Sequence, residues 1–329
     1  MPPDQSAGSS NRAPEPVIVL DGVRRHYGHA VAVDNVSLSI RRGEMFGLIG
    51  PDGAGKTTAI RLIAGLLPAT GGTVTVLGYD PVRQHRPVTG HLGYLSQRFS
   101  LYGDLTIDEN IAFFAEIHGV ADFRARRDRL LELTQLLPFR RRLADQLSGG
   151  MKQKLALACT LVHQPDIILL DEPTTGVDPV SRREFWKLLA EFLHQGLTIL
   201  MATPYLDEAE RCSRVALLHE GRLIALDDPS TLRAAFPGHI FEVVAEPFAK
   251  AQSLVLEQPI VEGAQSFGER LHVRFRADAP TNAAAALHAL LESAGLDRVV
   301  VRPVVASLED VFIERIRTAS ASSSRARLS

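Results

Sequence analysis

The chain has 329 residues, enough for one large α/β domain followed by a smaller one. Its 36 basic and 38 acidic side chains leave a net charge of −2 at pH 7, which argues against nucleic acid as a partner. The two cysteines, Cys159 and Cys212, lack the spacing of a metal site and fit a reduced cytosolic chain.

The ends of the chain and its apolar stretches bear on localisation. Residues 1–16 contain Pro, Ser and mixed charges without the apolar core of a secretory signal, so we expect a disordered tail there. Residues 319–329, rich in Ser and Arg, predict a second disordered tail. Apolar stretches such as 155–162 stop well short of the ~20 residues that a membrane-spanning helix requires. If the chain serves a membrane process, we expect the pore to be another polypeptide.

The first expected elements are strands followed by a helix. Residues 17–42 show strand alternation, 46–49 form a short apolar strand, and 58–63 continue as a helix. The sequence GPDGAGKT at 50–57 lies between that strand and that helix and fits the phosphate-binding pattern G-x-x-x-x-G-K-[ST]. A glycine-rich turn of accidental pattern is the alternative, and the flanking elements argue against it.

The residue types of this loop suit a nucleoside triphosphate. We expect positive φ angles at Gly50, Gly53 and Gly55, which let consecutive backbone N–H groups converge on phosphate oxygens at a helix start. Lys56 adds a mobile positive charge for the β- and γ-phosphates. The Thr57 hydroxyl is placed to bind Mg²⁺. The loop therefore predicts binding of a nucleotide with its magnesium ion.

The middle of the chain predicts a change from strand to helix. Residues 73–78 continue an antiparallel β region, and 104–147 show apolar residues at helical spacing. Two basic clusters, 124–129 and 140–142, lie on this helical region. Solvated helix faces explain them, and contact with anionic lipid headgroups is the alternative.

A second helix start follows the helical region. Ser148 suits an N-cap, and Gly149 and Gly150 allow close backbone approach at the start of a helix through 151–158. Such a helix start can bind an anion. Taken alone, the segment would be an ordinary capped helix.

An acidic pair follows a buried strand. Residues 166–173 (DIILLDEP) form an apolar run that ends in Asp171 and Glu172, as expected of a central parallel strand with ligands beyond its carboxyl end. We expect Asp171 to hold magnesium and Glu172 to orient the attacking water. A solvated loop after a core strand is the alternative.

The pattern changes after residues 237–238, where we place a boundary between domains at 17–236 and 237–318. The expected elements are strands at 240–245, 260–265, 270–275 and 298–304, and helices at 248–256 and 281–293. This β-α-β-β-α-β order fits a ferredoxin-like unit. Ser307 and Asp310 form a capping box for a last helix at 308–317. Dimer support, regulation and simple stabilisation remain open as its role.

Several motifs occur together and in order along the chain. They are Tyr27, GPDGAGKTT at 50–58, Gln97, LSGGMKQK at 147–154, LLDEP at 169–173 and GVDP at 176–179. The set resembles the ATP-binding subunit of an ATP-binding-cassette (ABC) transporter over about residues 17–235. The segment 307–312 is similar to the C-terminal extension of ATPase subunits from bacterial ABC-2 type drug-export systems. The resemblance implies an α/β P-loop NTPase cassette with an antiparallel β subdomain and a helical subdomain, followed by the small α+β domain.

The resemblance also implies roles for individual residues. Catalysis would involve Glu172, Lys56 and Gln97, and the metal ligands would be Thr57, Gln97 and Asp171. The residues implied in binding ATP are Tyr27, Gly50, Pro51, Asp52, Gly53, Ala54, Gly55, Lys56, Thr57, Thr58, Ser148, Gly149, Gly150 and Asp178. Tyr27 would stack on adenine, whereas an isolated aromatic here would normally be packing. Asp178 would lie at a dimer seam.

The partners follow from the same resemblance. Two cassettes would face head to tail, with the Ser148–Gly150 turn of one covering the γ-phosphate held by the other, in a homodimer or a heterodimer. The chain would work on the cytoplasmic face of the membrane, bound peripherally to a permease that exports drugs or other hydrophobic compounds. We expect Phe99, Leu101 and Tyr102 to line a groove for a permease helix, with core packing as the alternative.

One position departs from the family pattern. The stretch Thr203-Pro204-Tyr205 places Pro204 where the family usually has a His. Proline offers neither an N–H nor a side-chain donor to the γ-phosphate, and losing one such donor lowers the rate roughly a hundredfold. We therefore expect slow ATP hydrolysis by the chain alone. Whether Thr203 partly replaces the missing hydrogen-bond donor is left open by the sequence. Asp52 is a second, milder departure, because the family more usually has Asn at that position of the phosphate loop.

Other functions remain as alternatives. The chain could be the hydrolysis-poor, regulatory half of a heterodimeric ABC ATPase, for which Pro204 is the argument. Soluble cassette ATPases of translation or DNA repair usually carry two cassettes or a long coiled-coil insertion, and neither pattern occurs here. A phosphate-loop kinase would lack the LSGG motif.

Overall fold

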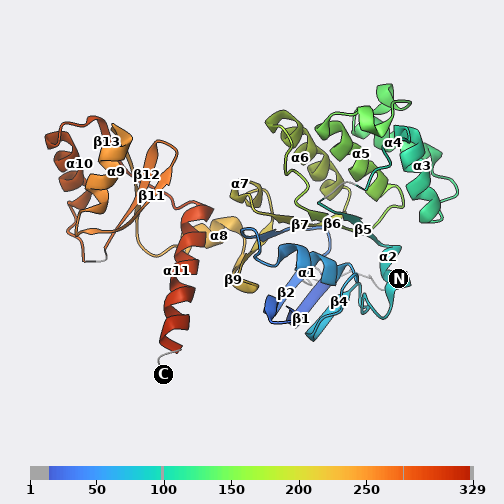
Figure 1. Ribbon diagram of the computed structural model, residues 1–329, viewed down its shortest axis with the longest axis horizontal. Helices are drawn as coiled ribbons and strands as arrows, with labels where there is room; N and C mark the ends of the chain where they lie inside the picture. Colours follow the sequence, from blue (N-terminus) through green and yellow to red (C-terminus); the bar gives the residue numbers. More distant parts are fainter. Residues whose placement is uncertain (1–14, 98–99, 277, 327–329) are drawn as a thin grey trace, which may run out of the picture. The chain divides into compact units, whose positions relative to one another are not determined.

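The computed structural model describes residues 15–97, 100–276 and 278–326. It divides into two compact units, Met1–Pro229 and Ser230–Ser329, which are described separately (Figure 1). The division falls after the first residue of helix α8 (Pro229–Ala234), whereas the boundary predicted from the sequence lies between residues 236 and 237. The strand pattern that marks the second unit resumes only at β10 (Ile240–Glu246), so the short helix before it gave no sequence signal.

The first unit contains a six-stranded sheet of order β5-β6-β7-β3-β8-β9. Its strands are β3 (Met45–Ile49), β5 (Leu92–Leu95), β6 (Ile167–Asp171), β7 (Thr198–Thr203), β8 (Arg214–His219) and β9 (Arg222–Asp227). All neighbours run parallel except β8 and β9. Every residue of β3 and β6 is buried, as expected of strands covered on both faces. Figure 1 shows α5 and α6 on one side of this sheet and α1 on the other.

A second, three-stranded antiparallel sheet packs in the same unit. It consists of β1 (Pro16–Tyr27), β2 (Ala30–Arg41) and β4 (Gly71–Val76), in the order β2-β1-β4. Ile18 of β1, Leu48 of β3 and Ile60 of helix α1 (Lys56–Ile63) belong to one core, and each is at most 1% exposed. This core joins the antiparallel sheet to the strand and helix that bracket the phosphate loop. The expected strands are therefore present and form a separate β layer.

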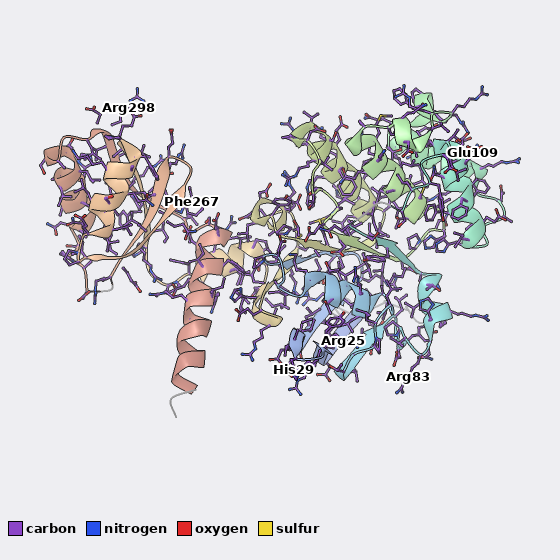
Figure 2. The ribbon with its side chains drawn as sticks, viewed as in Figure 1. Arg25, His29, Arg83, Glu109, Phe267 and Arg298 are labelled. Atoms are coloured by element: carbon purple, nitrogen blue, oxygen red, sulfur yellow. The ribbon has the colours of Figure 1, made fainter. Side chains whose placement is uncertain are left out.

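The region predicted to be helical contains several short helices. The helices of this unit beyond α1 are α2 (His85–Thr89), α3 (Ile107–Ile117), α4 (Arg124–Leu133), α5 (Gly149–Leu161), α6 (Pro179–His194) and α7 (Leu206–Ala209), with 3₁₀ turns at Leu137–Phe139 and Ala144–Gln146. A capping box between Thr106 and Glu109, the latter labelled in Figure 2, starts α3. Buried Asn110 then bonds the Tyr102 and Leu105 carbonyls and fixes the loop before the helix.

The second unit contains an antiparallel four-stranded sheet of order β11-β12-β10-β13. Besides α8 and β10, its elements are α9 (Phe248–Leu256), β11 (Val261–Phe267), β12 (Arg270–Phe275), α10 (Ala283–Ser293), β13 (Asp297–Val304) and α11 (Leu308–Ala326). Val243, Leu271 and Val273 of the sheet pack with Leu287 and Leu291 of α10. The β-α-β-β-α-β order is the one that the sequence predicts.

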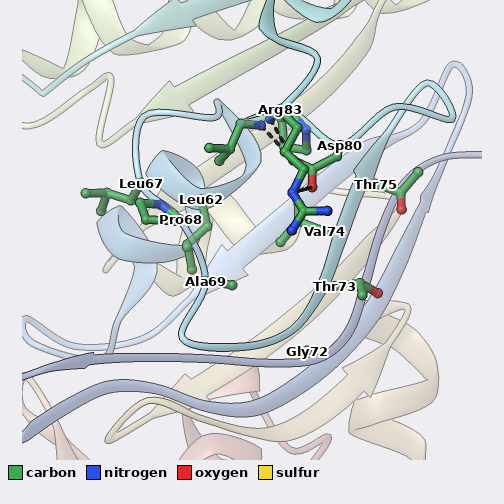
Figure 3. Close-up of a pocket in the computed structure, with 12 residues that line it drawn as sticks. Leu62, Leu67, Pro68, Ala69, Gly72, Thr73, Val74, Thr75, Asp80 and Arg83 are labelled. Atoms are coloured by element: carbon green, nitrogen blue, oxygen red, sulfur yellow. Dashed lines mark hydrogen bonds and ion pairs between the residues drawn. The ribbon is translucent and has the colours of Figure 1, made fainter.

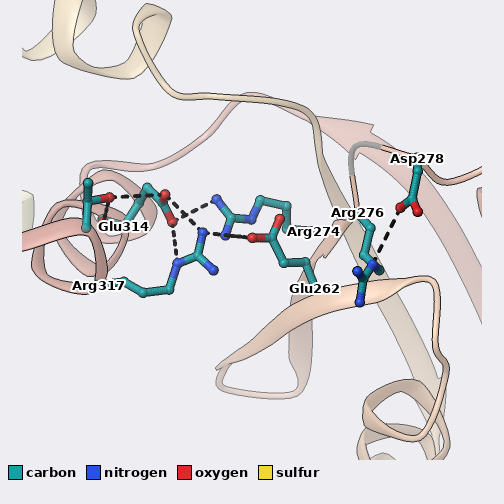
Figure 4. Close-up of polar contacts among 7 residues, drawn as sticks. Glu262, Arg274, Arg276, Asp278, Glu314 and Arg317 are labelled. Atoms are coloured by element: carbon teal, nitrogen blue, oxygen red, sulfur yellow. Dashed lines mark hydrogen bonds and ion pairs between the residues drawn. The ribbon is translucent and has the colours of Figure 1, made fainter. Parts of the chain in front are cut away.

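The last helix is longer than expected. Its predicted capping box is present, because Asp310 N–H donates to Ser307 Oγ at 3.1 Å and Ser307 N–H donates to Asp310 Oδ2 at 2.8 Å. Arg274 of β12 then pairs with Glu314 at 2.7 Å and anchors the helix to the sheet (Figure 4). The helix continues to Ala326, into the segment expected to be disordered, because adding residues to an established helix is easier than starting one.

The remaining parts of the two predicted tails, 1–14 and 327–329, lie outside the described residues. Among the residues that are described, none of the helices combines the length and the apolar character needed to span a bilayer.

Candidate nucleotide-binding site

The predicted phosphate loop joins β3 to α1. Gly53 (φ 78°) and Gly55 (φ 98°) adopt the left-handed conformation that was expected. The expectation was wrong for Gly50, which does not have a positive φ. Gly50 is required by space instead, because an added Cβ would collide with the carbonyl oxygen of Leu218 on β8. A Cβ on Gly55 would likewise collide with the carbonyl oxygen of Ala32.

Lys56 is held inside this loop. Its side chain is 4% exposed, and its Nζ donates to the carbonyl oxygens of Gly50 at 2.8 Å and Pro51 at 3.0 Å. The same Nζ lies 3.5 Å from Oε1 of Glu172. A buried ammonium group is costly unless it is paired, and these three oxygens compensate it. The lysine is therefore positioned at the loop by the protein itself.

The other loop residues surround this lysine. Pro51, Asp52 and Gly53 are exposed, Ala54 is buried, and Gly55, Thr57 and Thr58 are half-buried.

Thr57 and Asp171 meet although they lie far apart in the sequence. Thr57 Oγ1 donates to Asp171 Oδ1 at 2.9 Å, bringing the start of α1 to the end of β6. Burial raises the pKa of Asp171, the Thr57 bond opposes this, and the neighbouring Glu172 raises the pKa further. Two adjacent hard oxygen atoms are the donor set that Mg²⁺ prefers. These residues therefore fit the magnesium site that the sequence predicts.

Glu172 has a constrained backbone and two charged or polar neighbours. Its φ of 50° is unusual for a residue with a Cβ, and its N–H donates to the Ala202 carbonyl at 2.9 Å. Gln97 Nε2 donates to Glu172 Oε2 at 3.0 Å, while Lys56 faces the other oxygen. The structure thus brings the three predicted catalytic residues together. Because the Gln97 contact uses the amide nitrogen, a metal contact would need its amide oxygen.

The Ser148–Gly150 turn starts α5 as predicted. Ser148 Oγ accepts a hydrogen bond from the Met151 N–H at 3.3 Å. The space next to Gly149 is open, whereas a Cβ on Gly150 would collide with Ser181 of α6. Gly150 is thus explained within this chain by close packing of two helices. Contact of the turn with the nucleotide of a second cassette stays a prediction.

Asp178 has a local role that the sequence reasoning missed. It is the N-cap of α6, and its Oδ1 accepts the N–H groups of Val180 and Ser181, each at 3.0 Å. These bonds lower the pKa of Asp178, with the Ser181 backbone bond as the main cause. The Asp-Pro pair at 178–179 is the signal that could have revealed the cap, since Pro is favoured at the first helical position.

Tyr27 lies at the end of β1, opposite Ala30 in the hairpin with β2. The same hairpin carries Ala32, whose carbonyl approaches Gly55 of the phosphate loop. The Tyr27 side chain is 45% exposed, and the guanidinium of Arg25 lies 4.8 Å from its ring centre. The ring is therefore exposed on the hairpin that borders the loop, and stacking on adenine stays a prediction.

Comparisons with known proteins agree with this geometry. A family model described as ABC transporter matches residues 33–175. The chain is 39% identical over 315 residues to the probable multidrug ABC transporter ATP-binding protein YbhF of Escherichia coli (strain K12), covering 94% of this chain and 53% of that protein. It is 38% identical over 305 residues to Nod factor export ATP-binding protein I of Paraburkholderia xenovorans (strain LB400), covering 91% of this chain and 97% of that protein. This chain belongs to the ABC transporter ATP-binding proteins.

A solved structure supports the same assignment for the first unit. A dimeric bacterial ABC transporter cassette is 28% identical, with a TM-score of 0.58, over 64% of this chain and 98% of that chain. The ABC cassette fold, with its antiparallel β layer and its helices, is thereby confirmed. The chain spans about half the length of the first relative, which is therefore the longer protein.

The cassette also contains a buried acid that sequence reasoning did not single out. Glu208 of α7 is 1% exposed and accepts hydrogen bonds from Thr174 and, at 2.9 Å, from Arg182. Thr203 is fully buried, and its hydroxyl accepts the Tyr205 N–H at 3.1 Å. The segment around Pro204 is thus joined to the turn that follows Glu172. A glutamate inside a short acidic helix gives no sign of burial in the sequence.

The cassette also has a cavity away from the predicted nucleotide site. A cavity of about 380 Å³ lies along β4 and the turn at 80–83 (Figure 3). Its lining includes Leu62, Leu67, Val74, Asp80 and Arg83 but none of the predicted nucleotide-binding residues. The candidate nucleotide site is identified instead by the phosphate loop, Lys56 and the Asp171–Glu172 pair, which lie close together. A phosphate loop that is open to solvent need not form a deep pocket.

Proposed function

We propose that this chain binds and hydrolyses ATP to power a transporter that exports drugs or other hydrophobic compounds through a separate permease. The observation that carries the proposal is the convergence of Lys56, Thr57 and Gln97 on the Asp171–Glu172 pair. The family names of the relatives support transport, and the relative from Escherichia coli is described as a probable multidrug protein.

The chemistry follows from the positions of these side chains. Backbone N–H groups of the loop and Lys56 bind the phosphates, and Thr57 and Asp171 hold Mg²⁺. The ion would neutralise charge that develops on the phosphate oxygens. Glu172 orients the attacking water and accepts its proton, while Gln97 holds one carboxylate oxygen in place. Gln97 is also proposed to bind the metal ion or the water.

The assembly is proposed to contain two cassettes and a permease. The solved cassette that resembles this chain is dimeric, which supports pairing of two cassettes. The Ser148–Gly150 turn and Asp178 are proposed to lie at the interface of the pair. The pair is proposed to lie at the cytoplasmic face of the membrane. The alternative role, a hydrolysis-poor half of a heterodimer, is favoured by one specific observation, Pro204 at the usual His position.

The permease contact is proposed to involve Leu101 and Tyr102. Tyr102 is 45% exposed and packs edge-on against Phe113 at 4.5 Å between ring centres. Phe99, expected in the same groove, lies outside the described residues. A Tyr102→Asp variant in cells carrying the permease is expected to lose transport and keep ATP binding, and unchanged transport would contradict the groove.

The second unit is proposed to be a ferredoxin-like accessory domain that supports dimerisation or regulation. Its element order and its strand order β11-β12-β10-β13 support the ferredoxin-like description. The residues at 237–318 are the part proposed to carry this role.

Equilibrium titration with MgATP tests the core of the proposal. We expect saturable binding by the wild-type chain and about 10- to 100-fold weaker binding by Lys56→Ala, because charge-assisted contacts to phosphate are lost. Thermal unfolding of both proteins checks that the variant is folded. Full retention of affinity by Lys56→Ala would show that the nucleotide site is elsewhere.

A further inference from the structure

A second charged cavity lies in the first unit, outside the nucleotide-binding residues. It has a volume of about 220 Å³ and is lined by Pro179, Arg182, Arg183, Trp186, Asp207 and Arg211, which we call the arginine pocket. The first four residues come from the start of α6, and the other two come from α7 and the turn after it. None of them belongs to the predicted nucleotide site.

Two of the three guanidinium groups are held in place by their surroundings. Arg182 donates to buried Glu208 at 2.9 Å, and its guanidinium lies 4.8 Å from the centre of the Tyr205 ring. Arg211 lies 5.3 Å from the centre of the Trp186 ring, which is itself only 6% exposed. Stacking on aromatic faces restricts the rotamers of these arginines, so less entropy is lost when they bind a ligand.

The charge of the arginine pocket is not balanced by its own lining. The lining holds three arginines and one aspartate, and Arg182 is also paired with buried Glu208, so the local surplus is 3 − 2 = 1 positive charge. Asp207 lies 3.4 Å from Arg182. Within the part of the chain that the structure describes, Arg183 and Arg211 have no carboxylate partner. A pocket with unpaired guanidinium groups on its rim and a buried aromatic ring in its wall favours an anion.

Phosphate matches the pocket in charge and in geometry. Guanidinium groups bind phosphate oxygens through paired N–H donors, and Arg183 and Arg211 are the two guanidinium groups here that, among the described residues, are not paired with a carboxylate. We propose that the arginine pocket is a second anion site that binds the phosphate group of a soluble metabolite or a lipid headgroup. It is separate from the site that binds ATP.

The pocket is joined to the proposed catalytic residues. Pro179 follows Asp178 directly, and Glu208, which holds Arg182, also bonds Thr174 just after Glu172. An anion that binds Arg182 and shifts its side chain is therefore expected to displace both ends of the segment 174–178. Occupancy is expected to change the rate of ATP hydrolysis, and this consequence alone rests on the proposed function.

The fluorescence of Trp186 gives a direct test, because it is the only tryptophan of the chain. The nucleotide-free protein is titrated with inorganic phosphate and with pyrophosphate while its emission is recorded. We expect a saturable change that persists in Lys56→Ala. The apparent affinity should fall about tenfold or more in Arg183→Gln and in Arg211→Gln, and Arg86→Gln, an exposed arginine on α2, is the matched control.

Vesicles separate the two sources of phosphate. A response to phosphate alone assigns a soluble ligand. A response to vesicles of phosphatidylglycerol but not of phosphatidylcholine, lost in the same two variants, assigns a lipid headgroup. Arg183 is exposed on α6, so Arg183→Gln keeps the test open if Arg211→Gln fails to fold.

Three results would overturn the proposal: emission that does not change with any probe, a change that survives both arginine substitutions, or a change that disappears in Lys56→Ala. None of these measurements uses ATP turnover, so they do not depend on the proposed hydrolysis.

Discussion

Lys56 Nζ and Glu172 Oε1 lie 3.5 Å apart, in an ion pair whose side chains are 4% and 10% exposed. The residue proposed to bind phosphate and the residue proposed to activate water therefore form an ion pair within one chain. The second oxygen of Glu172 accepts from Gln97. The Glu172 carboxylate is therefore held between the Lys56 ammonium group and the Gln97 amide.

Replacing Glu172 by Gln is expected to remove hydrolysis and keep binding. An amide of the same shape cannot accept the proton of water, so turnover should fall at least about 100-fold. MgATP affinity should stay within a few-fold of wild type, since Lys56 and the loop are intact. Phosphate release and equilibrium binding measure the two effects. A variant that hydrolyses at the wild-type rate would remove Glu172 from the mechanism.

A Gly50→Ala substitution is expected to destabilise the first unit. The added Cβ would meet the Leu218 carbonyl oxygen, a backbone atom that cannot move freely. Overpacking of this kind costs about 1–3 kcal/mol of unfolding free energy, measured by urea denaturation. Gly90→Ala is the control, because Gly90 has open space around it and a φ of −66° that alanine accepts. Equal stability of the two variants would contradict the packing argument.

The sequence predicts this site well where the relevant residues are neighbours in the chain. The phosphate loop, the Asp171–Glu172 pair and the Ser148 cap each lie within one short segment, and their geometry agrees with expectation. Gly50 differs, because its constraint comes from Leu218, far along the chain. A sequence pattern reports local conformation, whereas such a contact depends on which strand lies next to β3.

The same limit explains the other differences. Burial of Glu208 depends on Thr174 and Arg182, which belong to other segments. The anchoring of α11 likewise depends on Arg274, which pairs with Glu314 from a separate strand. None of these three partner residues can be identified from the periodicity of the sequence alone.

We expect the stacked rings of His118 and His163 to make the unfolding free energy dependent on pH. Their centres are 3.7 Å apart, and burial lowers the pKa of His163 from 6.5 to about 4, with further lowering by His118 and His91. As the pH falls below 6.5, His163 becomes protonated in the unfolded chain but stays neutral in the folded chain until about pH 4. The unfolding free energy should therefore decrease between pH 6.5 and about 4, by about 1–3 kcal/mol.

A His163→Phe variant is expected to weaken this pH dependence, since it keeps a ring and removes the titrating group. Urea unfolding midpoints at pH 7 and pH 5 measure the difference. His29→Gln is the control, because His29 is exposed (Figure 2). Identical slopes for wild type and His163→Phe would assign the acid sensitivity to other groups.

Pro204 gives the sharpest prediction about activity. The neighbouring Thr203 is fully buried and its hydroxyl already accepts the Tyr205 N–H, so the oxygen is engaged by the backbone of its own turn. The Thr203 O–H is buried inside the protein and Pro204 has no donor, so we expect neither residue to donate to the γ-phosphate. Pro204→His is expected to raise steady-state turnover of the purified chain roughly a hundredfold, with a smaller change in KM.

The Pro204→Ala variant distinguishes the imidazole from the backbone. Alanine restores an N–H but supplies no side-chain donor, so its turnover should stay near that of wild type. If alanine accelerated hydrolysis as much as histidine, the proline ring would be the cause. If neither variant changed turnover, this position would not limit the rate, and the argument for a hydrolysis-poor half of a heterodimer would lose its only observation.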